Sequence, residues 1–205
     1  MWDVLEKVGN MKEHVQIGKY TYGVFDKNVI WDSEAWNYEG EKKQPKLIIG
    51  NYCSIGDYSK FYLGGNHRHD WVSTYPFQVK RLHNNIFNSI EDEINGYPLS
   101  NGDIIVGNDV WFGENVTVMS GIKIGDGAVI GTNSTVVKDV KLYSIVGGHP
   151  AKHIKYRFSD DIIEKLLQIK WWNMEDSELN LLLPYMCSDN IDYFFEEHNN
   201  LIKKI

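Results

Sequence analysis

The stretch DIIVGNDVWFGENVTVMSGIKIGDGAVIGTNSTVVKDV, residues 103–140, repeats a pattern every six residues. A large apolar residue opens each unit, and a small or β-branched residue follows four positions later. The pattern also occupies residues 49–61 and runs on to Leu142, so that its apolar positions are Ile49, Ile55, Phe61, Val106, Phe112, Val118, Ile124, Ile130, Val136 and Leu142. Glycine directly follows six of these ten residues.

A period of six fits neither an α-helix, whose period is 3.6 residues, nor an ordinary strand, whose period is 2. Three units of short strand and tight turn can instead close a triangular coil, with the apolar residue pointing inward and the small residue at a corner. Such coils stack roughly 4.8 Å apart, as strands do in a sheet. We ascribe the glycines to backbone conformations that residues with a Cβ adopt only at a cost. The sequence therefore predicts an all-β fold with C-terminal helices, a left-handed parallel β-helix of hexapeptide repeats.

The repeat is interrupted once, by a long loop at about residues 65–103 that is entered through Gly64-Gly65-Asn66-His67. An earlier hexapeptide, residues 17–22, stands out of register with the later ones. What interrupts a repeat is usually functional, because loops on a rigid scaffold carry binding and catalytic residues. The loop is therefore the first place to look for a site.

The repeat ends at the turn formed by residues 147–150. Ser159-Asp160-Asp161 then suits a helix N-terminus, and apolar residues follow at helical spacing up to Ile169. A second helix is expected from about Ser188 to the end. We therefore expect a β-helix domain over residues 1–158, with the loop 65–103 inserted, and a helical appendage over 159–205.

Composition narrows the possible partners and compartments. The formal net charge of −7 disfavours general nucleic-acid binding. No apolar run approaches the length of about eighteen residues that a membrane helix needs, and no signal peptide is recognisable, so we expect a cytoplasmic protein without membrane contact. Cys53 occupies a small inward position and Cys187 stands alone, so no disulfide is expected.

One segment departs from this acidity. Residues 138–157 contain five basic residues and one acidic residue. The basic residues are Lys138, Lys141, Lys152, Lys155 and Arg157. Two interpretations remain open: a solvated rim at the end of the prism, or a docking site for a polyanion such as a nucleotide phosphate.

Several stretches resemble the hexapeptide-repeat xenobiotic acetyltransferases, which include streptogramin (virginiamycin) and type B chloramphenicol acetyltransferases. The matching stretches are IIGNYCSIG (49–56), NHRHDWVSTYPF (66–77), the repeats of 103–140, VGGHPAKHIKYRF (146–158) and KWWN (170–173). The resemblance implies a homotrimer with active sites between subunits. It also implies transfer of acetyl from acetyl-CoA to a hydroxyl of a small molecule, with no metal, and it makes His67 the general base.

The chemistry of that reaction agrees with a histidine. An alcohol that attacks a thioester must lose its proton, and imidazole is the side chain best suited to accept it near neutral pH. His67 stands out among seven histidines because it lies where the repeat opens into the loop. A covalent acetyl-enzyme on Cys53 or a serine is the rival, but Cys53 is expected to be buried, so direct attack is preferred.

The remaining site residues follow from the resemblance and, for the cations, from charge. Trp111 would line the CoA groove, Gly131, Thr132 and Gly148 would let the pantetheine approach, and Tyr20 and Tyr22 would shape the acceptor pocket. The cations expected at the CoA phosphates are Lys152, Lys155 and Arg157.

The acceptor stays open between an antibiotic (chloramphenicol or a streptogramin) and a sugar or polysaccharide precursor. Residues 78–102 match no pattern of the family, and His149 replaces an asparagine usual in relatives. Two other functions are known to be compatible with this kind of fold. A zinc carbonic anhydrase would need three converging histidines, which the repeats between residues 106 and 142 do not supply. A non-catalytic scaffold would have no use for His67 or the basic segment.

Overall fold

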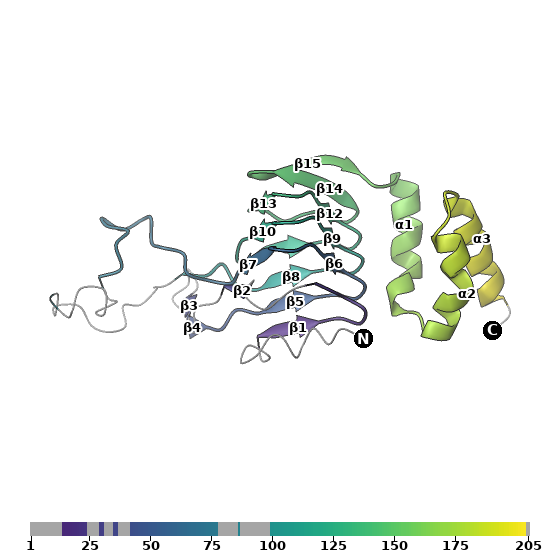
Figure 1. Cartoon of the computed structure of the whole chain (residues 1–205), viewed down its shortest axis with the longest axis horizontal. Coiled ribbons are helices and arrows are strands. Elements are labelled where there is room, and N and C mark those ends of the chain that lie inside the picture. Colours follow the sequence, from purple (N-terminus) through teal and green to yellow (C-terminus); the bar gives the residue numbers. More distant parts are fainter. Residues whose placement is uncertain are drawn as a thin grey trace. The chain divides into compact units, whose positions relative to one another are not determined.

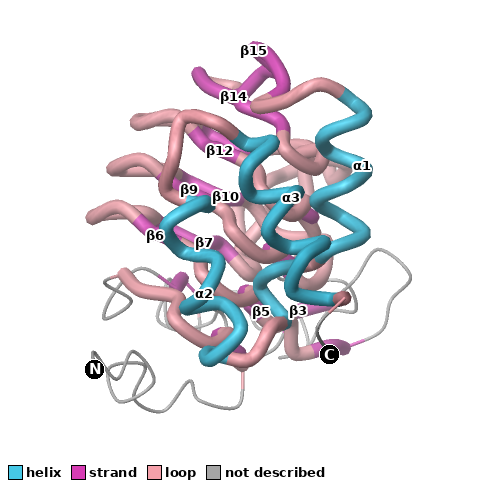
Figure 2. Tube along the Cα trace, turned by 90° about the vertical axis from the view of Figure 1, so that its right-hand side faces the viewer, coloured by secondary structure: helices cyan, strands magenta, loops and turns pink. Residues whose placement is uncertain are grey.

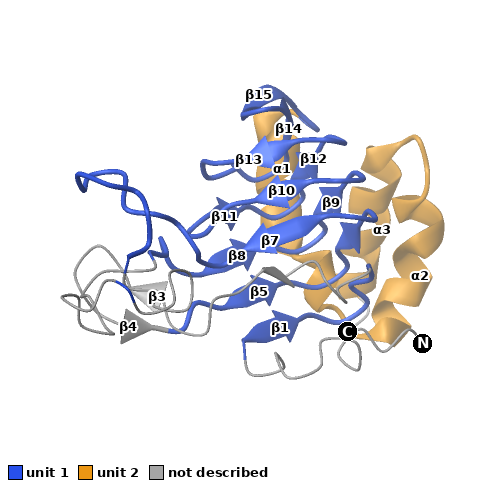
Figure 3. Ribbon diagram, turned by 60° about the vertical axis from the view of Figure 1, so that its left-hand side comes forward, with its two compact units in different colours: residues 1–158 blue, residues 159–205 orange. Residues whose placement is uncertain are grey.

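The computed structural model describes residues 14–23, 29–30, 35–36, 42–77, 86 and 99–203. The chain divides into two compact units, residues 1–158 and 159–205 (Figure 3). The first unit contains the strands, and the second contains three α-helices.

The first unit is built from three sheets of short strands that stack one above another (Figure 1). Sheet A consists of β1 (Val15–Ile17), β5 (Leu47–Ile49), β8 (Ile104–Val106) and β11 (Lys123–Ile124). Sheet B consists of β6 (Ser54–Ile55), β9 (Trp111–Phe112), β12 (Val129–Ile130), β14 (Ser144–Gly148) and β15 (Ala151–Tyr156). Sheet C consists of β2 (Val29–Ile30), β7 (Lys60–Tyr62), β10 (Thr117–Val118) and β13 (Thr135–Val136). A separate antiparallel pair is formed by β3 (Ala35–Trp36) and β4 (Lys42–Lys43).

The chain visits the sheets in the constant order A, B, C. Thus β8, β9 and β10 form one coil, and β11, β12 and β13 form the next, with parallel pairing between coils. Figure 2 shows β6, β9, β12 and β14 of sheet B at successive levels. We call the turns between the sheets the A/B, B/C and C/A corners. This arrangement fits the left-handed parallel β-helix that the sequence predicts.

The apolar positions of the repeat form the core. Nine of the ten predicted residues are buried, with exposed fractions of 4% or less. The small positions are buried as well, including Cys53, Ser59, Ala128 and Ser134. Leu142 is the exception, since 42% of it is exposed, and the prediction for it was wrong. The reason is a change of spacing: after Val140, which bridges to Ile124, the buried residue of the last turn is Tyr143.

The glycines of the repeat serve a different purpose from the one we predicted. None of the six glycines that follow an apolar position has a positive φ. Instead, each lies directly against the next coil. A Cβ on Gly113 would stand 2.6 Å from the backbone nitrogen of Thr132, and one on Gly50 would stand 2.6 Å from the carbonyl oxygen of Gly107. Close stacking, and not conformational freedom, requires five of these glycines, whereas a Cβ on Gly131 would stand 3.3 Å from the nearest atom, the carbonyl oxygen of Val146.

Positive φ occurs two residues after the glycine position, at the turns. The residues there are Tyr20, Tyr52, Tyr58, Asp109, Asn115, Gly121, Gly127, Asn133 and Tyr143. Asparagine, aspartate and glycine are the residues most tolerant of this conformation, whereas tyrosine adopts it only when the surroundings impose it. The four tyrosines at these turns explain why this part of the pattern is not evident from the sequence.

The early hexapeptide is in register with the others in space. Ile17 pairs with Ile49, which pairs with Val106, so the first coil is aligned with the second and third. Its offset along the sequence is taken up by the residues between the two coils. Of the predicted loop 65–103, the structure describes residues 65–77, 86 and 99–103, and the remainder lies outside the described residues.

The second unit consists of α1 (Asp160–Ile169), α2 (Asp176–Met186) and α3 (Ile191–Ile202). The helix α1 begins after Ser159, as predicted, and ends where Lys170 adopts a left-handed φ of 49° before a 3₁₀ turn, Trp171–Asn173. The helix α3 lies within the predicted second stretch, whereas α2 was not predicted. A proline, Pro184, lies inside α2 and masks its helical pattern in the sequence.

The contrast between Ile130 and Leu142 gives a test of where the repeat ends. Ile130→Ala removes a fully buried side chain and should lower the free energy of unfolding by about 3 kcal/mol. Leu142→Ala, at the same predicted position of the repeat, should cost only about 0.5 kcal/mol because Leu142 is exposed. Urea unfolding of both variants measures the difference, and equal losses would show that Leu142 belongs to the core.

Candidate active site

The loop that carries His67 leaves the prism at the C/A corner, between β7 and β8. Its neck is closed by Asn66 and Leu99, whose backbones exchange two hydrogen bonds of 3.1 and 3.0 Å. The Asn66 side chain also donates to the Ser120 hydroxyl at 3.2 Å. These bonds attach the start of the loop to the coil beneath it, so the backbone next to His67 is fixed by the rigid prism.

The imidazole of His67 is exposed, and its Nδ1 lies 2.7 Å from the backbone oxygen of Thr74. A carbonyl oxygen can only accept a hydrogen bond, so Nδ1 carries the proton. In the neutral ring the lone pair is then on Nε2, the nitrogen on the other side. The contact with Thr74 therefore fixes the tautomer that a general base requires.

The residues that follow His67 are bound to one another. Arg68 forms a two-pronged ion pair with Asp70, and its Nε lies 2.6 Å from Oδ1. The hydrogen bonds from Arg68 lower the pKa of the Asp70 carboxyl to about 2. The Arg68 guanidinium also lies over the Trp71 ring at 5.2 Å. Arg68 and Asp70 therefore shape the loop, while His69 is exposed.

Two predicted residues share the outer surface of sheet B. Tyr22 bridges to Ser54, and Ser54 pairs in turn with Trp111. Because stacked strands lie about 4.8 Å apart, the two aromatic residues stand about 10 Å apart along one column. Tyr22 is 57% exposed and Trp111 is 58% exposed. Tyr20, by contrast, belongs to the A/B corner, where its ring lies 5.1 Å from that of Tyr52.

The residues predicted to approach the pantetheine gather at the B/C corner. Gly131 donates its N–H to Val146 at 2.8 Å, and Gly148 donates its N–H to the Ser134 hydroxyl at 3.1 Å. Thr132 lines a pocket of about 440 Å³ that extends along this corner. The other residues that line the pocket are Tyr58, Lys60, Glu114, Asn115 and Asn133. The sequence pointed to Thr132 but not to the other five residues, four of which lie on other coils.

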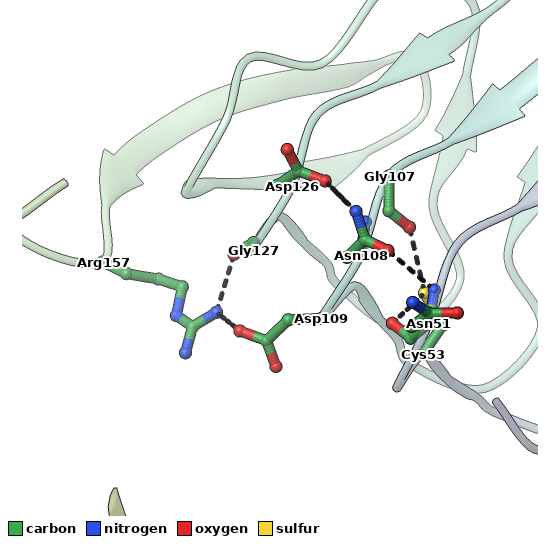
Figure 4. A network of polar contacts seen from close by, with 8 residues as sticks. All are labelled: Asn51, Cys53, Gly107, Asn108, Asp109, Asp126, Gly127 and Arg157. Carbon is green, nitrogen blue, oxygen red and sulfur yellow. Dashed lines mark hydrogen bonds and ion pairs between the residues drawn. The ribbon is translucent and has the colours of Figure 1, made fainter. Parts of the chain in front are cut away.

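The three predicted phosphate-binding cations lie on β15 or just beyond it. Lys152 and Lys155 are exposed and pair across the strand with Gly147 and Ile145 of β14. Arg157 differs from both: its Nη1 lies 2.9 Å from the Asp109 carboxylate and 2.8 Å from the Gly127 oxygen, at the A/B corner (Figure 4). No pattern in the sequence predicts this pairing, because Asp109 lies 48 residues away.

The thiol of Cys53 has the environment of a core residue. It is fully buried and donates to the Gly107 oxygen at 3.2 Å (Figure 4). Burial raises the pKa of the thiol to about 11. Since the thiolate is the nucleophilic form, Cys53 lacks both the access and the charge for covalent catalysis.

The sequences of several known proteins can be aligned with most of this chain. The model of the bacterial transferase hexapeptide family (six repeats) matches residues 103–138. A chloramphenicol acetyltransferase of Morganella morganii is 41% identical over 87% of this chain and 84% of its own. The chain belongs to the hexapeptide-repeat xenobiotic acetyltransferase family.

Other members of the hexapeptide-repeat xenobiotic acetyltransferase family are similarly close. A probable macrolide acetyltransferase of Lysinibacillus sphaericus is 50% identical over 70% of this chain and 78% of its own. A virginiamycin A acetyltransferase of Staphylococcus aureus is 41% identical over 88% of this chain and 80% of its own. The protein is thus an acetyl-transferring enzyme of this family.

None of the described helices combines the length and the apolar character needed to cross a bilayer. Among the described residues, no three histidine, cysteine, aspartate or glutamate side chains gather in a group that could hold a metal ion.

The two cysteines should react very differently with thiol reagents. In the native protein iodoacetamide should modify Cys187, which is exposed, and leave Cys53 unmodified, because the latter is buried and protonated at neutral pH. Mass spectrometry of tryptic peptides gives the answer, with the urea-unfolded protein as the control in which both react. Rapid native labelling of Cys53 would contradict the assignment and revive the acetyl-cysteine mechanism.

Proposed function

We propose that the protein is an acetyl-CoA-dependent O-acetyltransferase that acetylates a hydroxyl of a small molecule by direct attack. The observation that carries the proposal is the contact between His67 Nδ1 and the Thr74 oxygen, which leaves Nε2 with a lone pair at an exposed position. Membership of an acetyltransferase family supports the reaction class. The names of its relatives support a drug-like acceptor: chloramphenicol, macrolide and virginiamycin A acetyltransferases.

In the proposed reaction His67 Nε2 takes the proton of the acceptor hydroxyl while the oxygen attacks the thioester carbon. The new carbon–oxygen bond gives a tetrahedral intermediate, which collapses when the carbon–sulfur bond breaks. The leaving thiolate takes the proton back from the imidazolium. The Thr74 carbonyl would assist throughout, since it holds the ring and stabilises its positive charge while the proton resides on Nε2.

The CoA would lie along the B/C corner and the end of sheet B. Gly131, Thr132 and Gly148 would border the pantetheine, and Lys152 and Lys155 would meet the phosphates. Both lysines are exposed on one strand, which suits binding to a flexible polyanion. Trp111 would cover the mouth of the groove, with Tyr22 on the acceptor side and Tyr20 behind it.

The proposed site needs two chains. His67 lies at the C/A corner, whereas Tyr22 and Trp111 lie on sheet B, the face of the triangle that does not border this corner. The base of one chain can therefore meet an aromatic column only on a neighbouring copy. A ring of three such copies repeats the contact three times and closes, and so we propose a homotrimer with active sites between subunits.

The exposed surface of sheet B bears on the choice of acceptor. The column of sheet B presents two aromatic rings, and their apolar surface favours an acceptor with an apolar body and a hydroxyl. Chloramphenicol and group A streptogramins have that character. A sugar precursor is the alternative acceptor for the same site.

The general base can be tested with a neighbouring histidine as control. His67→Ala should reduce kcat by about a hundredfold or more, since general-base effects are of that size, while the oligomer and the acetyl-CoA affinity stay unchanged. His69→Ala, two residues along the same loop, should retain kcat within about twofold. Thiol release from acetyl-CoA measures both, and an unchanged kcat in the His67 variant would exclude it as the base.

The acceptor class can be tested by the same assay with a panel of compounds. Chloramphenicol, a group A streptogramin, a macrolide and maltose would each be offered with saturating acetyl-CoA. We expect thiol release with at least one of the three antibiotics and none with maltose. Turnover of maltose alone would replace the antibiotic with the sugar acceptor and leave the chemistry intact.

A further inference from the structure

We propose that Arg157 is a positioning residue for CoA binding: its ion pair with Asp109 holds β15 in the place where Lys152 and Lys155 can meet the phosphates. This inference rests on the proposed function. It also replaces the expectation that Arg157 itself contacts a phosphate, because the structure already engages its guanidinium.

Arg157 links three successive coils, and Figure 4 shows its side-chain contacts with two of them. Its backbone N–H donates to Tyr143 at 2.8 Å, in the last turn of the prism. Its Nη1 donates to the Gly127 oxygen one coil below, and to the Asp109 carboxylate one coil further, at 2.8 and 2.9 Å. One side chain thus connects the C-terminal end of β15 to the body of the prism over about 10 Å.

Two aromatic rings lie beside the guanidinium of Arg157. The Tyr143 ring, only 1% exposed, lies 5.4 Å from the guanidinium carbon, and the Phe158 ring lies 5.2 Å from it. The absence of a side chain at Gly127 makes room for this stack, since a Cβ there would stand 2.5 Å from the Tyr143 ring. Aromatic faces attract a cation, so the rings reinforce the ion pair.

The charge balance also favours an internal role. Burial raises the pKa of the Asp109 carboxyl, the Asp126 charge raises it further, and Arg157 acts in the opposite direction. If Arg157 turned outward to a phosphate, Asp109 would remain as a poorly solvated carboxylate beside a second acid. Leaving one partner of such a pair alone is the costly case, and so the pair should persist when CoA binds.

The lysines depend on the anchorage of β15. Among the described strands, β15 pairs with β14 alone, and its register shifts between Ile145 and Val146. At its N-terminal end the turn is held by the bond from Gly148 to Ser134 and by His149 Nδ1, 2.6 Å from the Thr135 hydroxyl. At the C-terminal end of β15, the ion pair between Arg157 and Asp109 holds the strand to the prism. Lys152 and Lys155 lie between the two anchors.

A double-mutant cycle separates positioning from direct contact. Arg157→Gln and Asp109→Asn should each raise the KM for acetyl-CoA about fivefold, and the double variant should be no worse than either single variant. The KM for S-acetyl-pantetheine, which lacks the nucleotide and its phosphates, should not change. If Arg157 contacts a phosphate directly, Asp109→Asn will leave the KM for acetyl-CoA unchanged or lower it, and that result overturns the proposal.

Hydrogen exchange keeps this test independent of the enzymatic assay. In the protein without CoA, both single variants should speed amide exchange over residues 151–156, while residues 104–136 stay protected as in the wild type. Asp139→Asn is the matched control, since it removes a carboxylate that binds the Lys123 N–H at 2.8 Å without touching β15. Unchanged exchange in β15 would overturn the anchoring role. Faster exchange with unchanged KM, together with an unchanged KM in Lys152→Gln and Lys155→Gln, would instead refute the phosphate site of the proposed function.

Discussion

The close stacking of successive coils is the constraint on which the rest of the structure depends. Adjacent coils approach so closely at the A/B and B/C corners that a Cβ on Gly50, Gly107 or Gly113 would collide with the backbone of the next coil. The buried residues of three sheets then fill the prism, and each exposed side chain is assigned to one face or one corner. No side chain can move to another face without a change of register.

A rigid triangular prism keeps its faces apart. His67 and the aromatic column of Tyr22 and Trp111 come from parts of the triangle that cannot meet within one chain. The proposed reaction needs both, so under this proposal copies of the chain must come together for catalysis. In the proposed complex the same rigidity would give the CoA a fixed edge along the B/C corner.

The sequence predicts the prism well because its period reflects a local rule that every coil obeys. Nine of ten inward residues, the small corner residues and the helix α1 follow from spacing, whereas α2 was missed. The errors have physical causes. Leu142 fails because the last turn changes its spacing, and the glycines had a steric reason that only the stacked coils reveal. The contact of Arg157 with Asp109, between coils, and that of His67 with Thr74, within the loop, depend on side-chain geometry that no periodicity encodes.

The shared site is the central claim, and mixed oligomers test it most directly. His67→Ala and Trp111→Ala chains, each inactive alone, would be co-expressed with different tags, and the doubly tagged oligomers would be purified and assayed. If each site takes its base from one chain and its aromatic face from the next, every doubly tagged trimer has one site that combines two intact halves, about a third of its sites. The mixed oligomers should then recover roughly that share of the wild-type activity. A mixture as inactive as its two parents would place both residues in a site within one chain and contradict the account.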